Sequence, residues 1–432
     1  MKETLRRLFL EVLGALSLEP AMRERIRVAE GVLEADDERI DLRPFKKIIL
    51  VALGKAAYPM ARTMQALLDP LIASGVVVSS EAPPSPLPYV LHYRGGHPYP
   101  NAESLHAAEV ILRLLEQLHQ NHLVLFLLSG GGSAIVEKPI DPIISLDDLR
   151  AFYQVLVTCG ADIVEMNVLR KHFSAVKGGR MAEAAYRARQ ATFYVSDVPA
   201  DRPSTVASGP TMPDESTVAD CREILGRRGL MGRLPASIRE LVETGAVPET
   251  PKPGSQRFKR ASWHVLLSND QARGKLQAVA EAQGWVVEQD ISVDDRPVAE
   301  AAERLLARLA DLREPNAGRT VAVVSGGELS SPVTGGGVGG RNQAFVLACA
   351  KRIAGQNVAV MSAGTDGIDG NSPAAGAVAD GETLNRGRIL GLSARDYFDR
   401  SDSFGYFSAL GDALITTPTG NNVRDVRLLV GW

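Results

Sequence analysis

The segment Lys47-Ile-Ile-Leu-Val-Ala-Leu53, followed by Gly54 and Lys55, decides the fold class of this chain. Its apolar residues are consecutive rather than alternating, which predicts a strand that is buried on both faces. A helical pattern begins at about Ala56 and extends to Leu68. A buried strand that leads through a glycine directly into a helix is typical of a parallel sheet covered by helices. The segment therefore predicts an α/β fold.

The same succession of strand, loop and helix recurs along the chain. A proline- and glycine-containing segment at about residues 249–260 interrupts it and predicts a linker. We therefore expect two α/β domains, at residues 1–255 and 256–432, with a cleft between them. The predicted strands are 47–53, 75–79, 123–128 and 191–195 before the linker, and 263–267, 286–290, 320–324, 357–362, 413–416 and 426–430 after it.

Length, charge and cysteine content exclude several classes of protein. At 432 residues the chain is too long for one compact core. Its 48 basic and 51 acidic residues give a formal net charge of −3, so no overall field attracts nucleic acid or an anionic membrane. The three separated cysteines indicate a reducing compartment. Because no apolar run reaches the roughly 18–20 residues that span a bilayer, we expect a soluble, cytoplasmic protein.

Glycine, serine and charged residues gather where the predicted strands end. The clearest such loop is Ser129-Gly-Gly-Gly-Ser133, directly after the strand at 123–128. In open α/β sheets, ligands bind beyond the carboxyl ends of the strands, and the backbone N–H groups of such turns suit phosphate or carboxylate. The loop therefore either cradles an anion or is a tight turn from strand to helix. Comparable loops are Gly54-Lys55, Ser196-Asp197, Ser325–Glu328 and Thr365–Gly370.

Two cations stand at such loops. Lys55 opens a predicted helix, where its charge opposes the helix dipole, so an anionic ligand would account for it; a solvated lysine is the alternative. Arg341 follows the cluster Gly335–Gly340, which formally matches GxGxxG but stands too far behind its strand for a dinucleotide fingerprint. We expect this cluster to form a flexible loop over phosphates. Arg341 would then bind a phosphoryl or carboxylate oxygen, with a surface salt bridge as the alternative.

Asp197 and Asp366 are the candidate acidic site residues. A carboxylate such as Asp197, facing a phosphate cradle, can hold Mg²⁺ or accept the proton of an attacking hydroxyl. The alternative is a turn residue in a proline-containing loop, shared with Asp201. Asp366 lies in Thr365-Asp-Gly-Ile-Asp-Gly370, which lacks the later ligands of an EF-hand loop. It is either a site residue or part of an Asp-Gly turn.

The stretch Met166–Arg180 and His97 allow both functional and structural interpretations. The stretch holds several cations, Lys171 and Lys177 among them, near one face of a predicted helix. They form either a carboxylate-binding patch or the polar side of a surface helix. His97, within Gly-Gly-His-Pro-Tyr-Pro, is expected to be structural and to lie in a proline turn.

Short motifs follow one another over most of the chain. They are Val51-Ala-Leu-Gly-Lys-Ala-Ala57, Gly96-His-Pro98, Leu128-Ser-Gly-Gly-Gly-Ser-Ala134, Val168-Leu-Arg-Lys-His-Phe-Ser174, Lys177-Gly-Gly179, Ser196-Asp197, Ser208-Gly-Pro-Thr211, Ser325-Gly-Gly-Glu328, Gly339-Gly-Arg-Asn342 and Gly364-Thr-Asp-Gly-Ile-Asp-Gly370. In this order they resemble the glycerate 2-kinase family. The resemblance extends over most of the chain and does not depend on a single short motif, which makes it specific.

The resemblance implies a Rossmann-like N-terminal domain, a leucine-rich MOFRL-type C-terminal domain and an active site in the cleft between them. It implies phosphorylation of D-glycerate by ATP, with Mg²⁺, to 2-phosphoglycerate. Lys55, Asp197 and Arg341 look like the family's catalytic residues, and Asp197 is also the candidate metal ligand. The residues expected to bind ATP are Ser129, Gly130, Gly131, Gly132, Ser133, Ser325, Gly326, Gly327, Glu328, Gly337, Gly339, Gly340 and Asp366.

Two other functions are compatible with the sequence. A hydroxypyruvate reductase, a name sometimes attached to relatives of this family, would need an NAD(P)H site, and only the displaced GxGxxG suggests one. A non-catalytic protein that binds small anionic metabolites would use the same loops. Release of ADP in the presence of D-glycerate separates the kinase from both. We expect no nucleic-acid or membrane partner, and the sequence leaves a homo-oligomer open.

Overall fold

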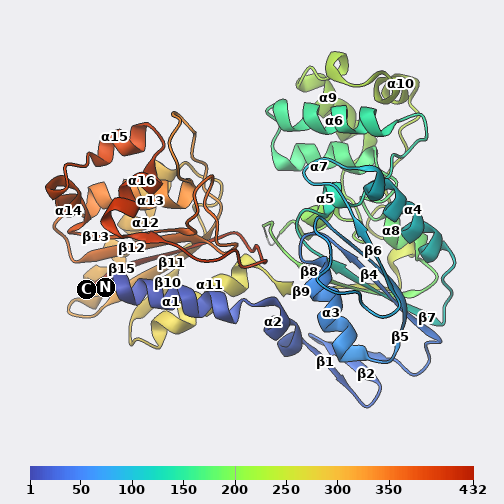
Figure 1. The fold of residues 1–432 in the computed structure, drawn as a ribbon, viewed down its shortest axis with the longest axis horizontal. Helices are drawn as coiled ribbons and strands as arrows, with labels where there is room; N and C mark the ends of the chain where they lie inside the picture. Colours follow the sequence, from blue (N-terminus) through green and yellow to red (C-terminus); the bar gives the residue numbers. More distant parts are fainter. Residues whose placement is uncertain (200) are drawn as a thin grey trace. The chain divides into compact units, whose positions relative to one another are not determined.

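The computed structural model describes residues 1–199 and 201–432, which form two compact units (Figure 1). The N-terminal unit is Ala21–Leu266, and the C-terminal unit is Leu267–Trp432 together with Met1–Pro20. This division differs from the expected boundary between residues 255 and 256 at two places. The strand β9 (Ala261–Leu267) lies next to β8 (Arg189–Val195) in the sheet of the N-terminal unit. The first helix of the chain belongs to the C-terminal unit.

This first helix, α1 (Lys2–Ala15), has one apolar face of fully buried residues, Leu5, Leu8, Phe9 and Val12. Their spacing of three and four residues places them on one side of a helix. The helix packs against α11 (Asn269–Glu281) and against strands of the C-terminal sheet. The spacing predicts that the helix packs on an apolar surface but does not say which surface. The expected domain of residues 1–255 included α1, whereas α1 belongs to the C-terminal unit.

The N-terminal unit is built on a six-stranded sheet with the order β6-β5-β4-β7-β8-β9. Its central strand, β4, has Val51 opposite Val76 of β5 and Phe126 of β7, and both pairings are parallel. Residues Ile48–Leu53 of β4 are all buried, as expected of a strand covered on both faces. The other bounds are β5 (Ile72–Ser79), β6 (Val90–Arg94), β4 (Lys47–Leu53) and β7 (His122–Leu128).

Helices cover both faces of this sheet. The chain passes from β4 through α3 (Ala57–Leu68) to β5 in one direction and from β6 through α4 (Ala102–Glu116) to β7 in the other. Because such crossovers are right-handed, the two helices lie on opposite faces. The core on the α4 side also includes residues of α8 (Arg180–Ala184). The loops that follow β4, β7 and β8 therefore leave the sheet at the same edge.

The rest of the N-terminal unit is a helical cluster and a small sheet. The helices α6 (Leu146–Thr158), α7 (Ile163–His172), α9 (Val218–Arg227) and α10 (Ala236–Thr244) share an apolar core of their own. The small antiparallel sheet is β1 (Ile26–Ala29), β2 (Val32–Ala35) and β3 (Glu38–Asp41). The remaining short elements are α5 (Gly132–Ile135), η1 (Pro203–Ser208), η2 (Met231–Arg233) and η3 (Gln256–Phe258), and α2 (Leu18–Arg25) contains the boundary between the units at Pro20 and Ala21.

The C-terminal unit has a mixed six-stranded sheet with the order β10-β11-β15-β12-β13-β14. Only β10 and β11 are parallel, and β15 is antiparallel to both of its neighbours. Because β15 enters the sheet from the opposite end, its first residue, Asp425, pairs with Gly327 at the end of β11 and with Gly364 at the end of β12. The bounds are β10 (Val286–Gln289), β11 (Val321–Gly327), β12 (Val358–Gly364), β13 (Gly376–Asp380), β14 (Ala413–Leu414) and β15 (Asp425–Gly431).

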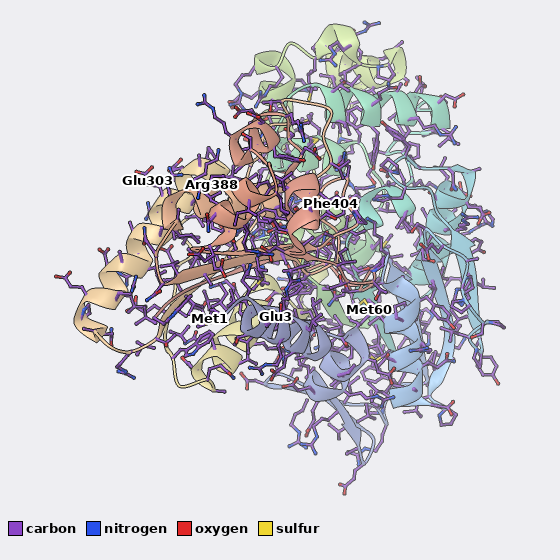
Figure 2. The ribbon with its side chains drawn as sticks, turned by 60° about the vertical axis from the view of Figure 1, so that its left-hand side comes forward. Met1, Glu3, Met60, Glu303, Arg388 and Phe404 are labelled. Carbon is purple, nitrogen blue, oxygen red and sulfur yellow. The ribbon has the colours of Figure 1, made fainter. Side chains whose placement is uncertain are left out.

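Two layers of helices enclose this mixed sheet (Figure 1). One layer is α1 with α11, and the other contains α12 (Val298–Arg313) and α13 (Arg341–Ile353). Outside α13 lie α14 (Thr383–Ile389), α15 (Ala394–Asp399) and α16 (Ser403–Leu410), and η4 (Glu314–Asn316) follows α12. Figure 2 labels Glu303 on α12, Arg388 on α14 and Phe404 on α16. None of the helices among the described residues has both the length and the apolar character to cross a bilayer.

Candidate active site

The loops after β4 and β7 lie against each other. Leu53 and Leu128 are paired at the ends of these strands, so the two loops begin side by side. The N–H of Lys55 donates to the carbonyl oxygen of Gly130 at 3.0 Å, and the N–H of Ala56 donates to Oγ of Ser129 at 3.0 Å. Sheet register and hydrogen bonds thus fix Lys55 beside the predicted Ser129–Ser133 loop.

Glycine is required where these loops meet. Gly54 has φ +115°, and a Cβ there would overlap the carbonyl oxygen and Oγ of Ser129. Gly131 has φ +82°, and a Cβ there would lie 3.1 Å from Cγ of Lys55 and 3.3 Å from Cδ2 of His97. Only glycine adopts such angles at little cost. The close approach of Lys55 and His97 therefore depends on a residue without a side chain.

Asp197 completes this group. A Cβ on Gly130 would overlap Oδ2 of Asp197, so the carboxylate lies directly over the glycine loop. Asp197 is half-buried and Lys55 is exposed. The structure thus gathers Lys55, the glycine loop and Asp197 at one edge of the sheet, as their positions at strand ends suggested. Asp201, in contrast, is exposed and lies 3.8 Å from its neighbour Arg202.

His97 also lies beside this group, next to Gly131. Burial, together with the positive charge of Lys55, lowers the pKa of His97 below the ordinary value for histidine. A neutral His97 leaves Lys55 as the positive charge beside Gly131. The motif Gly96-His-Pro98 signalled His97, but a turn histidine is more often structural.

A second set of polar contacts also holds the glycine loop. Oγ of Ser133 lies 2.8 Å from Oγ of Ser208, which donates to Oδ1 of Asn167 at 2.8 Å. Ala207 and Ser208 have positive φ angles of 50° and 59°, which non-glycine residues adopt at a cost. A Cβ on Gly132 would lie 2.6 Å from Cβ of Ala207. Strained backbone therefore packs tightly beneath the loop.

Two lysines of the stretch Met166–Arg180 have neither of the two roles that were expected for them. Lys177 and Glu137 are buried and form an ion pair, and Ser174 donates to Glu137 at 2.5 Å. Lys171, also buried, pairs with Asp214 at 3.0 Å. Both lysines thus neutralise internal carboxylates, so they form neither a carboxylate-binding patch nor the polar side of a surface helix. A group of cations in the sequence does not reveal such internal partners.

The buried Glu137 is also joined to the glycine loop. Tyr153 donates to Glu137 at 2.5 Å and approaches the carbonyl oxygen of Ser133 at 2.7 Å. Burial raises the pKa of Tyr153 well above the ordinary value for tyrosine, and the charge of Glu137 adds to this shift. Burial lowers the pKa of Lys177 in spite of its partner. The sequence interpretation missed Glu137 and Tyr153, because neither belongs to a glycine-rich motif.

In the C-terminal unit, Arg341 is held by two carboxylates. Its Nε donates to Oδ2 of Asp425 at 2.6 Å and its Nη2 donates to Oδ1 at 3.1 Å, while Nη2 lies 3.0 Å from Oε1 of Glu328. Burial alone would lower the pKa of Arg341, but the hydrogen bonds and charge of Asp425 outweigh it and raise that pKa. The alternative of a surface salt bridge is wrong in part, because Asp425 is 1% exposed.

Two aspartates of the Thr365–Gly370 loop lie near Arg341 and differ in role. Asp366 is half-buried, and burial, with a smaller contribution from Asp425, raises its pKa. Asp369 is buried and accepts from the N–H groups of Asn342 at 3.0 Å and Gln343 at 2.9 Å. Asp369 therefore caps the first turn of α13. Burial raises the pKa of Asp369 to about 6, against these hydrogen bonds.

The other predicted glycine loops of this unit are packed against protein atoms. The N–H of Gly327 donates to Oδ1 of Asn269 at 2.9 Å, and the N–H of Glu328 donates to Oδ1 of Asp294 at 2.9 Å. A Cβ on Gly326 would overlap Oδ1 of Asn269. Two of the amides expected in a phosphate cradle are thus already bonded, because asparagine and aspartate side chains fill the space beside β11.

The Gly335–Gly340 loop is pinned rather than free. The N–H of Gly337 donates to the carbonyl oxygen of Arg400 at 3.2 Å, and the N–H of Gly339 donates to Oδ1 of Asn371 at 2.9 Å. A Cβ on Gly337 would lie 2.5 Å from Cβ of Asp402, and one on Gly340 would overlap Asp369. Close packing against neighbouring segments therefore explains these glycines, and a flexible loop over phosphates stays a prediction.

Comparison with known proteins identifies the family. Residues 4–243 match the sequence family described as "Domain of unknown function (DUF4147)", and residues 321–425 match the MOFRL family. A D-glycerate 2-kinase of Thermotoga maritima is 34% identical over 389 residues, which are 89% of this chain and 90% of that protein. The chain belongs to the glycerate 2-kinase family. A second relative in the glycerate 2-kinase family, from Pyrococcus horikoshii, is 29% identical over 98% of this chain and 96% of its own length.

Solved structures and one differently named relative extend this comparison. The crystal structure of a glycerate kinase from Thermotoga maritima has a TM-score of 0.86 at 31% identity and covers 100% of this chain and 99% of its own. This likeness confirms the α/β fold class. A protein of Agrobacterium vitis that is 37% identical over 94% of this chain and 93% of its own carries a provisional hydroxypyruvate reductase name.

Proposed function

We propose that this member of the glycerate 2-kinase family transfers the γ-phosphoryl group of ATP to the 2-hydroxyl of D-glycerate. The observation that carries the proposal is the meeting of Lys55, Asp197 and the glycine loop at Gly130 and Gly131. The proposal is also supported by the match to a D-glycerate 2-kinase, which covers 90% of that relative. The products would be 2-phosphoglycerate and ADP.

Phosphoryl transfer mainly requires alignment of the reactants and neutralisation of the charge on the equatorial oxygens. Lys55 can supply part of this neutralisation, because its ammonium is exposed and its stem is fixed against Gly131. Arg341 can supply a planar fork for a phosphoryl or carboxylate oxygen. Asp425 and Glu328 hold that fork in one orientation.

Asp197 has two candidate roles. As a base, Asp197 accepts the proton of the 2-hydroxyl while that oxygen bonds to the γ-phosphorus and the bond from phosphorus to the leaving ADP oxygen breaks. As a metal ligand, Asp197 would hold Mg²⁺, which would neutralise charge on the phosphates of ATP. No group of three or more His, Cys, Asp or Glu residues suited to a metal occurs in the described part of the chain. A single carboxylate fits Mg²⁺, because this ion commonly binds through one or two carboxylates and substrate phosphates.

One assay tests the proposed function. The purified chain is mixed with ATP, Mg²⁺ and D-glycerate, ADP release is followed by a coupled assay, and the phosphorylated carbon is identified by phosphorus–proton NMR. ADP release with phosphate on carbon 2 supports the proposal. Binding of ATP and glycerate without ADP release would instead support a non-catalytic binder of anionic metabolites.

The oxidoreductase alternative is tested with the same protein. The name of the Agrobacterium vitis relative favours it, whereas the Gly335–Gly340 loop packs against the segment around Arg400 and does not form a strand-to-helix turn. We expect no oxidation of NADH or NADPH with hydroxypyruvate. Oxidation that depends on the protein would revive the alternative.

Asp197→Asn separates the two roles of Asp197. If Asp197 is the base, turnover falls by about 10²–10⁴ while the affinity for ATP with Mg²⁺ stays unchanged. If it is a metal ligand, that affinity falls and a higher Mg²⁺ concentration restores part of the rate. Asp201→Asn is the matched control, since Asp201 is exposed beside Arg202.

A further inference from the structure

The C-terminal unit contains a cavity of about 720 Å³. The start of α12, the segment 329–340, the start of α13 and the end of α15 form its wall. Its volume lies within the range of about 300–1,000 Å³ that is typical of small-molecule sites. Apart from Arg341, the neighbouring glycines and Asn371, this wall contains no residue of the candidate active site.

Part of the wall is aromatic. Tyr397 and Phe398, at the end of α15, are half-buried and line the cavity. The guanidinium carbon of Arg400 lies 3.9 Å from the ring centre of Tyr397, and Nζ of Lys351 lies 4.5 Å from that of Phe398. Tyr397 also packs edge-on against Tyr406. Other side chains thus hold both rings in place, and such rings suit a flat heterocyclic ligand.

Another part of the wall is a loop that is bonded to the segment after α15. The N–H of Thr334 donates to Oγ of Ser401 at 2.9 Å, and the N–H of Phe404 donates to the carbonyl oxygen of Val338 at 2.9 Å. Phe404 is labelled in Figure 2. These bonds within the protein hold the loop in place beside the cavity.

Polar groups of opposite charge stand on different parts of the wall. Asp399, at the end of α15, lines the cavity, and its side chain is 62% exposed and lies 3.5 Å from Arg395. An acidic residue commonly accepts the hydrogen bonds of ribose hydroxyls. Arg341, at the start of α13, also lines the cavity with a guanidinium that is bonded to Asp425 and Glu328, and guanidinium groups bind phosphate. Aromatic rings, an acceptor for hydroxyls and a cation are the three features that a nucleoside phosphate requires.

We propose that this cavity binds the nucleoside part of ATP. The base lies against Tyr397 and Phe398, the ribose hydroxyls donate to Asp399, and the phosphates extend toward Arg341. The proposal rests on the proposed kinase function, because that function is what brings ATP to the protein. It adds a location for the base, which no glycine loop of the chain identifies.

Ala344→Trp tests the location by filling the cavity. Ala344 lies on α13 and lines the cavity without contributing to the ion pairs of Arg341. Binding of adenosine and of a non-hydrolysable ATP analogue to the full chain is measured by isothermal titration calorimetry. We expect both affinities to fall by at least about tenfold, because the indole occupies the space of the base.

Ala307→Trp is the matched control. Ala307 is exposed on α12 and lines a separate hollow of the same unit, with Leu306 and Arg352. The same change of residue there should leave both affinities as in the wild type. Circular dichroism shows whether each variant is folded.

Phe398→Leu is the second variant and keeps the proposal testable if Ala344→Trp does not fold. Leucine keeps an apolar side chain but lacks the flat ring, so we expect the affinity for adenosine to fall about fivefold or more. Wild-type affinities in both folded variants would overturn the proposal.

The outcomes separate this proposal from the proposed function. If the chain does not phosphorylate D-glycerate, but binds adenosine and loses this binding in Ala344→Trp, the nucleoside site is supported and the kinase function is overturned. If the chain phosphorylates D-glycerate and the KM for ATP is unchanged in Ala344→Trp, the kinase function is supported and the nucleoside site is overturned. A wild-type chain that binds no adenine nucleotide overturns both.

Discussion

Asp425 accepts two hydrogen bonds from the guanidinium of Arg341, at 2.6 Å from Nε and 3.1 Å from Nη2. Asp425 is 1% exposed, whereas the Arg341 side chain is 34% exposed. An internal carboxylate thus fixes a partly accessible cation. Because Asp425 pairs with the last residues of both β11 and β12, Arg341 is held where these strands end.

Asp425→Asn should lower both stability and turnover. The amide keeps the shape of the carboxylate but removes its charge, so we expect the free energy of unfolding to fall by about 2 kcal/mol. A reoriented Arg341 should lower kcat by about tenfold or more. Urea denaturation and the ADP-release assay measure the two effects. Asp295→Asn, at a side chain that is 78% exposed, is the control, and wild-type kcat in Asp425→Asn would contradict a role of this pair in the reaction.

Gly130→Ala should displace Asp197. The new methyl group would overlap Oδ2 of Asp197, so we expect turnover to fall by about a hundredfold while circular dichroism shows a folded chain. Gly226→Ala, in the exposed part of α9 with no atom within 4 Å of the new Cβ, should stabilise the chain by up to about 1 kcal/mol. Equal turnover in the two alanine variants would mean that Asp197 does not act at the glycine loop.

Asp369 should make stability depend on pH. Burial raises the pKa of Asp369 to about 6 in the folded chain, above the ordinary value of 3.8. A raised pKa contributes stability that is fully present below about pH 3.8 and is lost as the pH rises through 6. We expect this contribution to be at most about 3 kcal/mol and to be absent from Asp369→Asn. Urea denaturation of both proteins at pH 5 and pH 8 measures it, and parallel changes in the two proteins would show that Asp369 titrates normally.

Tyr153→Phe should loosen the support of the glycine loop. The change removes the hydroxyl that reaches Glu137 and the carbonyl oxygen of Ser133, so a buried carboxylate loses one donor. We expect the free energy of unfolding to fall by about 1–3 kcal/mol. Tyr89→Phe, at a side chain that is 76% exposed, should change it by less than about 0.5 kcal/mol. Thermal and urea denaturation of the two variants compare the same loss of one hydroxyl.

Lys55→Met should raise the pKa of His97. The positive charge of Lys55 is the second cause, after burial, of the lowered pKa of His97. Methionine keeps most of the stem that packs on Gly131 and removes the charge, so the pKa should rise while burial keeps it below the ordinary value. An NMR titration of the His97 ring measures the change without any assay of activity. An unchanged pKa would show that the Lys55 ammonium lies away from His97.

The central strands could be predicted from the sequence almost to the residue. The expected strand at 47–53 is β4, and the one at 123–128 is β7, which begins one residue earlier, at His122. Both are continuous apolar runs, because helices cover both faces of a parallel sheet. The gathering of Lys55, the Ser129–Ser133 loop and Asp197 followed from the parallel order, which brings the carboxyl ends of strands to one edge.

Long-range pairing could not be predicted in the same way. The strand at 426–430 was expected, but nothing local shows that β15 lies antiparallel between β11 and β12. That insertion alone brings Asp425 to Arg341. Glu137 was missed for a similar reason, because its partners Lys177 and Tyr153 come from distant positions that meet only in the folded core.

The docking of α1 on the C-terminal unit affects the order in which the chain matures on the ribosome. α1 is synthesised before α11 and the strands that it covers, and the whole of Ala21–Leu266 lies between them in the chain. The apolar face of α1, with Leu5, Leu8 and Phe9, therefore stays exposed or is bound by a chaperone while the N-terminal unit is synthesised and folds. The C-terminal unit is thus completed by two segments that are far apart in the chain. We expect a destabilising substitution in either segment to lower the stability of the whole unit.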